Sequence, residues 1–124
     1  MEEKWIAIDF DGTLVVDAFP NIGDDNPHAV EVVKRLRRDG CKIALNTCRQ
    51  GIHLQAAVEW MVSRGITPDS VNDNPYARAK WGGNDCKKVY ADVYIDDHSV
   101  GIKKTSLGSV DFKYIKRNYK RLFT

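Results

Sequence analysis

Short apolar runs alternate along this chain with segments of helical periodicity, and this order constrains the fold more than any other feature. Runs typical of buried strands occupy four stretches, roughly residues 4–9, 41–46, 70–72 and 89–95. Apolar residues recur at helical spacing over 27–39 and 51–65, and again from Ser109 to the end. This alternation predicts an α/β fold with a mainly parallel sheet, helices on its faces and right-handed crossovers.

Local signals suggest where individual elements begin and end. Asn26 followed by Pro27 is typical of a helix start, with the asparagine as N-cap, and Gly40 is typical of its end. Residues 74–88 are rich in Asn, Gly and Lys, and we expect them to be irregular or weakly helical.

Length, composition and charge narrow the class of protein. A chain of 124 residues has the size of one domain, so we expect 1–124 to form a single one. A hydrophobic fraction of 43% is sufficient for a packed core. The net charge of +2 predicts no strong global attraction to nucleic acid or to membranes. No stretch approaches the ~18 apolar residues that a membrane-spanning helix needs.

The N-terminus and the cysteines suggest a compartment. Met1-Glu2-Glu3 is acidic where a signal peptide would be basic. The cysteines are odd in number and lack the paired close spacing of a zinc site: Cys41, Cys48 and Cys86. We interpret them as free thiols in a reducing cytoplasm.

Polar side chains follow three of the four predicted strands. They are Asp9 and Asp11 after the first strand, Asn46, Thr47 and Arg49 after the second, and Asp96, Asp97 and His98 after the fourth. The carboxyl ends of parallel strands meet at one edge of a sheet, where ligands bind in open α/β folds. These side chains are therefore expected to converge although they lie far apart in the sequence.

Four carboxylates at one edge would repel each other strongly in a partly desolvated cleft. A bound cation removes that cost, and oxygen ligands without a Cys or His cluster favour Mg²⁺ over Zn²⁺. Each acid pair taken singly has a simpler interpretation, because Asp-Gly is usually a turn and two acids after a strand can begin a loop. Their coincidence at successive strand ends favours a cation-dependent catalytic site.

The string Asp9-Phe10-Asp11-Gly12-Thr13-Leu14 resembles the first motif of the haloacid dehalogenase-like superfamily of phosphohydrolases at every defining position. Thr47 resembles the hydroxyl of the second motif, and Asp96-Asp97 resembles the paired-acid form of the fourth. The third motif is a lysine upstream of the fourth strand, for which Lys88 is the first candidate and Lys87 and Lys80 are the rivals. The resemblance implies a three-layer α/β/α, Rossmann-like domain.

The resemblance also implies the roles of the two acids after the first strand. Asp9 would be the nucleophile that attacks phosphorus and forms an aspartyl-phosphate. Asp11 would protonate the leaving oxygen and then activate water. An acid at position 11 argues against dehalogenase chemistry, because the dehalogenases of this superfamily do not use one there.

A Mg²⁺ site and a phosphate site follow from the same resemblance. Mg²⁺ would be held by Asp9, by the backbone carbonyl of Asp11 and by Asp96, with Asp97 supporting the shell directly or through water. Thr47 and Lys88 would bind the transferring phosphoryl oxygens. Arg49, two positions after Thr47, is a further candidate to clamp a phosphate, although it equally suits a surface position.

Many members of the superfamily carry a cap domain after the first motif or between the second and third. Here both intervals are too short to build one, so we expect a capless member with an open active-site mouth. Such a mouth admits large substrates, or a neighbouring subunit of a homo-oligomer closes it.

We therefore expect a Mg²⁺-dependent phosphomonoester hydrolase, with the physiological substrate left open. One alternative is a nucleic-acid or nucleotide end-processing phosphatase, which would use the basic residues of the last helix near the mouth: Lys113, Lys116, Arg117, Lys120 and Arg121. Another is a binding or regulatory module that keeps the fold without turnover, and the presence of both Asp9 and Asp11 counts against it.

Overall fold

A computed structural model describes residues 3–82 and 87–124, and Cys86 lies outside them. Its strands are β1 (Trp5–Ile8), β2 (Lys42–Leu45), β3 (Ser70–Val71) and β4 (Val93–Ile95). Its helices are α1 (Ala29–Arg38), α2 (Gly51–Ser63), α3 (Pro75–Trp81), α4 (Phe112–Arg117) and α5 (Tyr119–Phe123). Among the helices described, none has the length and apolar character that crossing a membrane requires.

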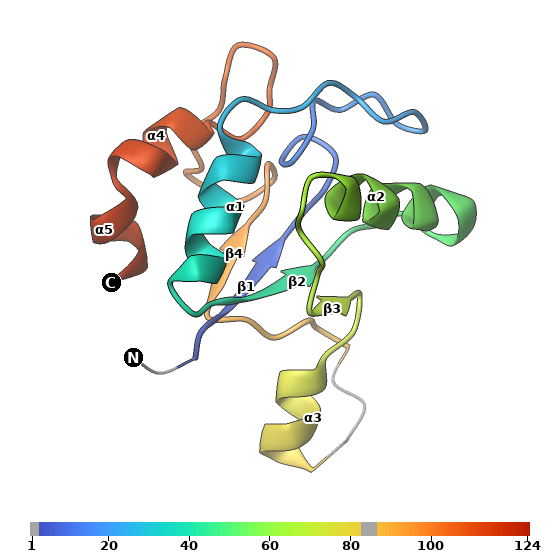
Figure 1. The fold of residues 1–124 in the computed structure, drawn as a ribbon, viewed down its shortest axis with the longest axis vertical. Coiled ribbons are helices and arrows are strands. Elements are labelled where there is room, and N and C mark those ends of the chain that lie inside the picture. Colours follow the sequence, from blue (N-terminus) through green and yellow to red (C-terminus); the bar gives the residue numbers. More distant parts are fainter. Residues whose placement is uncertain (1–2, 83–86) are drawn as a thin grey trace.

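The four strands form one parallel sheet in the order β3-β2-β1-β4 (Figure 1). Ile8, the last residue of β1, pairs with Leu45 of β2 and with Ile95 of β4, so these three strands end at the same level. The predicted α/β class and parallel sheet are confirmed. The alignment of the strand ends brings the three polar segments to one edge.

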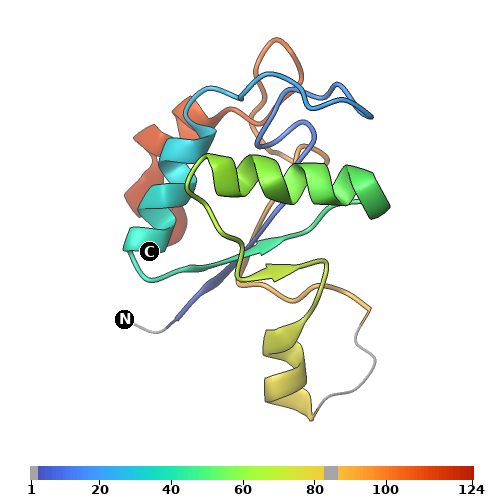
Figure 2. The ribbon, with the colours of Figure 1, turned by 45° about the vertical axis from the view of Figure 1, so that its right-hand side comes forward.

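The two faces of the sheet carry different layers because successive side chains of a strand point to opposite sides. Ile6 and Ile8 of β1 pack into the main core with residues of α1, α2 and α4, whereas Trp5 and Ala7 face a smaller apolar cluster on the other side. The chain moves from β1 to β2 to β3 in one direction, which puts α1 and α2 on one face. The connection back to β4 reverses direction, and its helix α3 lies on the side opposite α2 (Figure 2).

The turn after β1 contributes buried side chains to the hydrophobic core, as the strand itself does. Phe10, Leu14 and Val15 are fully buried, and the ring of Phe10 meets the edge of Trp60 from α2 at 5.5 Å between centroids. The acids of this turn are thus held between apolar anchors. Burial of alternate residues fixes where Asp9 and Asp11 lie.

The fourth strand is shorter than predicted, because the backbone of residues 89–91 is bonded to side chains rather than to a neighbouring strand. The hydroxyl of Tyr94 donates to the carbonyl of Val89 and accepts from the N–H of Ala91, while the N–H of Tyr90 donates to the side chain of Asn74. The first part of the β-branched and aromatic run that predicted a strand over 89–95 is therefore an irregular segment, held by the hydroxyl of Tyr94.

The predicted N-cap of the first helix is wrong. Helix α1 begins at Ala29. The residue before it is His28, which has a positive φ of 67° and takes the N-cap position. Asn26 is buried, and its Nδ2 donates to the carbonyl oxygens of Thr13 at 2.8 Å and Val110 at 2.7 Å. Its amide therefore joins the turn after β1 to the segment before α4.

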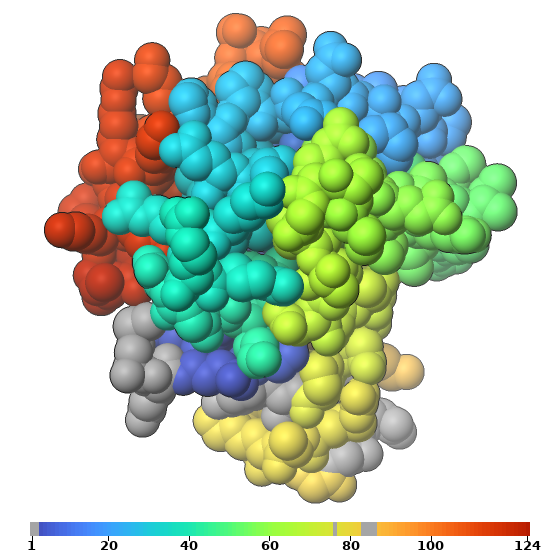
Figure 3. All heavy atoms as spheres, in the orientation of Figure 1, coloured from blue at the N-terminus to red at the C-terminus, as the bar shows by residue number. Residues whose placement is uncertain are grey.

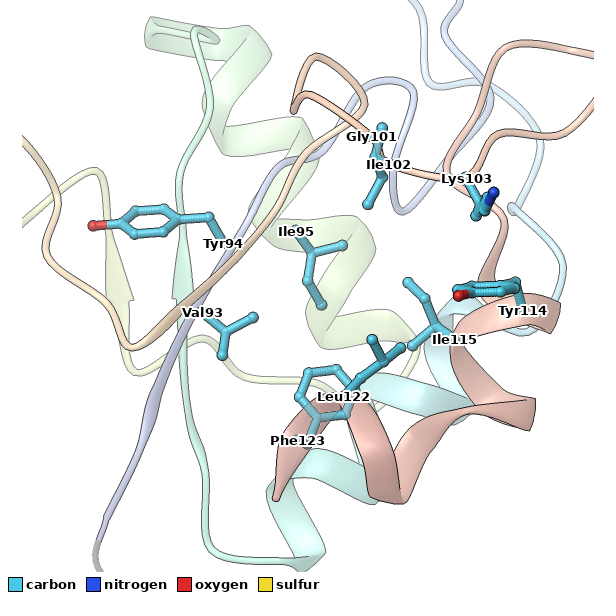
Figure 4. A pocket seen from close by; sticks show the side chains of 10 residues that line it. All are labelled: Val93, Tyr94, Ile95, Gly101, Ile102, Lys103, Tyr114, Ile115, Leu122 and Phe123. Carbon is cyan, nitrogen blue, oxygen red and sulfur yellow. The ribbon is translucent and has the colours of Figure 1, made fainter.

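The single C-terminal helix predicted from Ser109 is divided at Asn118 into α4 and α5. The carboxylate of Asp111 accepts from the N–H of Tyr114 and caps α4. Figure 4 shows side chains of α4 and α5 meeting Ile95 beside β4, around an apolar cavity of about 230 Å³. Lys4, just before β1, donates to the carbonyl of Phe123, so α5 ends beside the start of the strand, away from the acids.

Candidate active site

Asp9 and Asp11 leave the end of β1 in a turn that only glycine at position 12 allows. Gly12 has a φ of +78°, in the left-handed region that other residues avoid. A Cβ added to it would lie 2.3 Å from Oδ2 of Asp97, so the glycine also lets the segment after β4 approach the turn after β1. The Asp-Gly pair is thus needed for a close contact between two strand ends.

Three carboxylates converge at this edge, as predicted. One oxygen from each of Asp9, Asp96 and Asp97 lies within 4.8 Å of the other two. Burial, followed by the neighbouring charges and hydrogen bonding of Asp96 and Asp97, raises the pKa of Asp9 to about 8, against an opposing hydrogen bond from the backbone of Phe10. The surroundings of Asp9 therefore disfavour a negative charge on its carboxyl group.

The same three residues fit a hard divalent cation. Oδ1 of Asp97 is buried, and no hydrogen-bond donor among the described residues reaches it. A buried acceptor without a hydrogen-bond partner lacks an interaction that a bound cation would supply. The atoms that could coordinate the cation are all carboxylate oxygens, which hard divalent cations prefer. The carboxylate of Asp96 is oriented by the N–H of His98, which donates to Oδ1 at 2.8 Å.

The carboxylate of Asp11 points elsewhere, to Arg49. Nε and one terminal nitrogen of Arg49 donate to the two Asp11 oxygens, each at 2.7 Å. The other hydrogen bonds that the guanidinium makes to described residues go to the backbone carbonyls of Pro20, Asn21 and His53. Arg49 is only 2% exposed, so the side chain that the sequence offered as a phosphate clamp is engaged within the protein.

Thr47 is oriented by a residue from the next strand end. Its N–H donates to Oδ1 of Asn72 at 2.8 Å, and its hydroxyl accepts from the N–H of Arg49 at 3.2 Å. Asn72 has a positive φ of 47° and donates from its own N–H to Leu45. The position of Asn72 directly after β3, at the same edge of the sheet, is the sequence signal of this supporting role.

None of the three candidate lysines is among the described residues that line the acidic cavity. Nζ of Lys88 lies 5.1 Å from the centroid of the Tyr94 ring, and Nζ of Lys80 lies near the rings of Trp81 and Tyr90. Lys87 is exposed. The choice among the three lysines stays a prediction.

A cavity of about 390 Å³ contains the acids and the second strand end. Its lining comprises Asp9, Asp11, Asp17, Phe19, Asn46, Thr47, Cys48, Arg49, Asp96, Asp97 and His98. Asp17 and Phe19 come from the connection between β1 and α1, and sequence reasoning missed them because nothing in the local pattern marks them. Among the described residues, the interval after the first motif holds a loop and α1, and the interval after Thr47 holds α2, β3 and α3. The absence of a cap domain stays a prediction.

Comparison with known proteins identifies one solved structure of similar fold. No family model and no curated protein matches this chain. A structure described as that of a conserved protein coded by a locus from Bacteroides thetaiotaomicron is 32% identical, with a TM-score of 0.80, and the match covers 99% of this chain and 94% of that one. That description states no activity.

Proposed function

We propose that this chain, which belongs to the same family as the conserved Bacteroides thetaiotaomicron protein, is a divalent-cation-dependent phosphomonoesterase of the haloacid dehalogenase-like type. The observation that carries the proposal is the convergence of Asp9, Asp96 and Asp97 within 4.8 Å, next to Asp11 at the end of the same strand. Cytoplasmic location, suggested by its cysteines, belongs to the proposal as well.

In the proposed reaction Asp9 supplies the nucleophile. One of its carboxylate oxygens attacks phosphorus, the bond from phosphorus to the leaving oxygen breaks, and an aspartyl-phosphate forms. Asp11 acts in its protonated form: it gives its proton to the leaving oxygen and becomes a carboxylate. It then takes a proton from a water molecule, whose oxygen attacks the same phosphorus and releases inorganic phosphate, and Asp9 returns to its initial state.

The carboxylates of Asp9, Asp96 and Asp97 would hold the cation, with the backbone carbonyl of Asp11 as a further ligand. Mg²⁺ is the proposed ion, and when bound it supplies positive charge that offsets the repulsion between these acids and the anionic substrate. Without it, the pKa of about 8 leaves Asp9 mostly protonated at neutral pH, and a protonated carboxyl group is a poor nucleophile.

We assign Arg49 a positioning role toward Asp11 in place of direct phosphate binding. The five hydrogen bonds that its guanidinium makes to described residues all go to Asp11 and to backbone carbonyls, so binding a phosphate would require it to release several of them. Thr47 and Lys88 remain the proposed ligands of the phosphoryl oxygens. Lys88 would have to move from the Tyr94 ring toward the cavity to reach them.

The nucleic-acid alternative requires the basic residues of α4 and α5 near the mouth. None of the five is among the described residues that line the acidic cavity, so the site gives this alternative no support. The non-catalytic reading predicts binding without turnover, so activity measurements separate it from the proposal.

The aspartyl-phosphate can be trapped in a variant that makes it but breaks it down slowly. We expect purified Asp11→Asn, given Mg²⁺ and p-nitrophenyl phosphate, to accumulate one phosphoryl group on the peptide that contains Asp9, detected by mass spectrometry of the denatured protein. This leaving group needs little protonation, so the first step survives the substitution. Asp9→Asn should carry no phosphoryl group, and an active wild-type enzyme without modification of that peptide would refute the assignment.

A further inference from the structure

Phe19 places a phenyl ring at the mouth of the acidic cavity. The residue is 56% exposed and lines the cavity together with Asp9 and Asp11. Phe10 and Leu14, the large apolar residues earlier in the same segment, are completely buried. Phe19 therefore presents apolar surface to solvent beside the acids that line the cavity.

The ring is held in place by polar and aromatic neighbours. The guanidinium carbon of Arg49 lies 5.1 Å from its centroid, and the ring of His53 meets it at 5.4 Å with an angle of 62° between the planes. The N–H of Phe19 donates to the carboxylate of Asp17. Because Arg49 is buried and bonded on several sides, it gives Phe19 a fixed support.

Hydrogen bonds hold the loop that carries Phe19 both at its base and at its tip. At the base, the N–H of Val16 donates to the carbonyl of Asp24, and a Cβ added at Gly23 would lie 1.7 Å from the carbonyl oxygen of Val16. At the tip, Arg49 donates to the carbonyl of Asn21 at 2.8 Å. Figure 3 shows this part of the chain, in blue, lying against α2, in green.

We infer that Phe19 is a specificity-determining residue that packs against the leaving group, and that the substrates are phosphomonoesters whose leaving group carries a planar aromatic ring. The inference rests on the proposed phosphatase function and names its substrate class. Phe19 is the one phenyl ring among the described residues that line the cavity, and apart from Cys48 the other lining residues have polar or charged side chains. Polar groups would hold the phosphate, which leaves Phe19 to contact the rest of the substrate.

An aromatic ring in the substrate would gain more from Phe19 than a saturated ring of the same size. Aromatic pairs stabilise each other through stacked or edge-to-face contacts beyond the area they bury, by an amount that corresponds to about a two- to tenfold change in affinity. A saturated ring retains the area but lacks the π system. Comparison of the two isolates the contribution of Phe19.

The first experiment measures binding with phosphonates, which the enzyme cannot hydrolyse, in the presence of Mg²⁺. We expect the wild-type protein to bind benzylphosphonate about two- to tenfold more tightly than cyclohexylmethylphosphonate in calorimetric titrations. Phe19→Leu should abolish this preference and Phe19→Tyr should retain it. Ile52→Ala, which removes an apolar side chain that is 76% exposed and outside the cavity lining, should leave the preference unchanged.

The second experiment measures turnover of phenyl phosphate and of a nucleoside 5′-monophosphate, which carry the aromatic ring at different distances from phosphorus. Of the two substrates, the one whose KM rises in Phe19→Leu, with a smaller change in kcat, is the one whose aromatic ring contacts Phe19. An active wild-type enzyme that shows no preference for the aromatic phosphonate, or keeps its preference in Phe19→Leu, would overturn this inference and leave the phosphatase function intact. Absence of both turnover and phosphonate binding would instead overturn the proposed function, and the inference with it.

Discussion

The carboxylate of Asp11 accepts two hydrogen bonds of 2.7 Å from the guanidinium of Arg49, and the side chain of Arg49 is only 1% exposed. The two residues are 38 positions apart and belong to different strand ends. A bidentate pair of this kind fixes the plane of the carboxylate as well as its position. In the proposed reaction, this pair would therefore set the direction from which Asp11 delivers a proton.

We expect Arg49→Gln to lower kcat by about 100-fold for an alkyl phosphate, the scale of loss that misplacing a catalytic group can cause. The loss should be smaller for p-nitrophenyl phosphate, because a good leaving group needs less protonation from Asp11. Arg49→Lys should recover only part of the activity, because an ammonium group cannot hold both carboxylate oxygens in a fixed plane. Steady-state kinetics with the two substrates measures the difference.

Arg64→Gln provides the matched control for this prediction. Arg64 also binds a carboxylate, that of Asp25, at 2.7 Å, but it lies outside the lining of the acidic cavity. Its loss should leave the ratio of the two activities unchanged. Equal losses of both activities in Arg49→Gln would indicate a structural role for Arg49 and contradict positioning of Asp11.

The metal-free protein should become less stable as pH rises from about 4 to about 8. Burial and neighbouring acids raise the pKa of Asp9 from 3.8 to about 8 in the folded state, so the folded protein binds more protons than the unfolded chain over this interval. Stability therefore falls with pH until Asp9 has lost its proton. Thermal unfolding in EDTA at a series of pH values measures this slope.

Asp9→Asn is the control for the pH dependence, because it keeps the shape of the side chain and removes its titration. We expect a flatter dependence of Tm on pH in this variant, and we expect Mg²⁺ to raise the Tm of the wild-type protein more at pH 8 than at pH 5. A slope that is the same in Asp9→Asn and wild type would assign the dependence to other groups.

Asp97→Asn should weaken Mg²⁺ binding at least tenfold, because the amide removes a negative charge from the proposed shell. The buried Oδ1 of Asp97, which no described donor reaches, is the observation behind this expectation. Calorimetric titration with Mg²⁺ gives the affinity. Asp24→Asn changes an exposed carboxylate outside the cavity lining and should bind Mg²⁺ like the wild type.

Asn26→Ala should lower the free energy of unfolding by about 2–3 kcal/mol, because it leaves the carbonyls of Thr13 and Val110 without their donor in a buried site. Denaturant unfolding measures the change. Gln55→Ala on the exposed face of α2 should change stability by less than about 0.5 kcal/mol. A similar small effect in Asn26→Ala would show that water replaces the amide at little cost.

Local pattern in the sequence determined the class of fold and the edge that carries the acids. An apolar run such as Trp5–Ile8 predicts a strand because its residues must be buried on both faces, and parallel strands bring their carboxyl ends to one edge. The convergence of Asp9, Asp96 and Asp97 follows from that topology without any knowledge of side-chain packing. The expectation that the chain lacks a cap domain rests on the lengths of two intervals and stays a prediction.

Tertiary structure decided which partner each polar side chain takes. The pairing of Arg49 with Asp11 and the role of Asn26 between two distant carbonyls join residues from different elements, and the hydroxyl of Tyr94 holds the segment just before its own strand. Hydrogen bonds depend on distances and angles that arise only when the helices pack on the sheet, and the same residue types suit several partners along the chain. Periodicity in a sequence records which side of an element is buried, but it does not record what a buried polar group meets there.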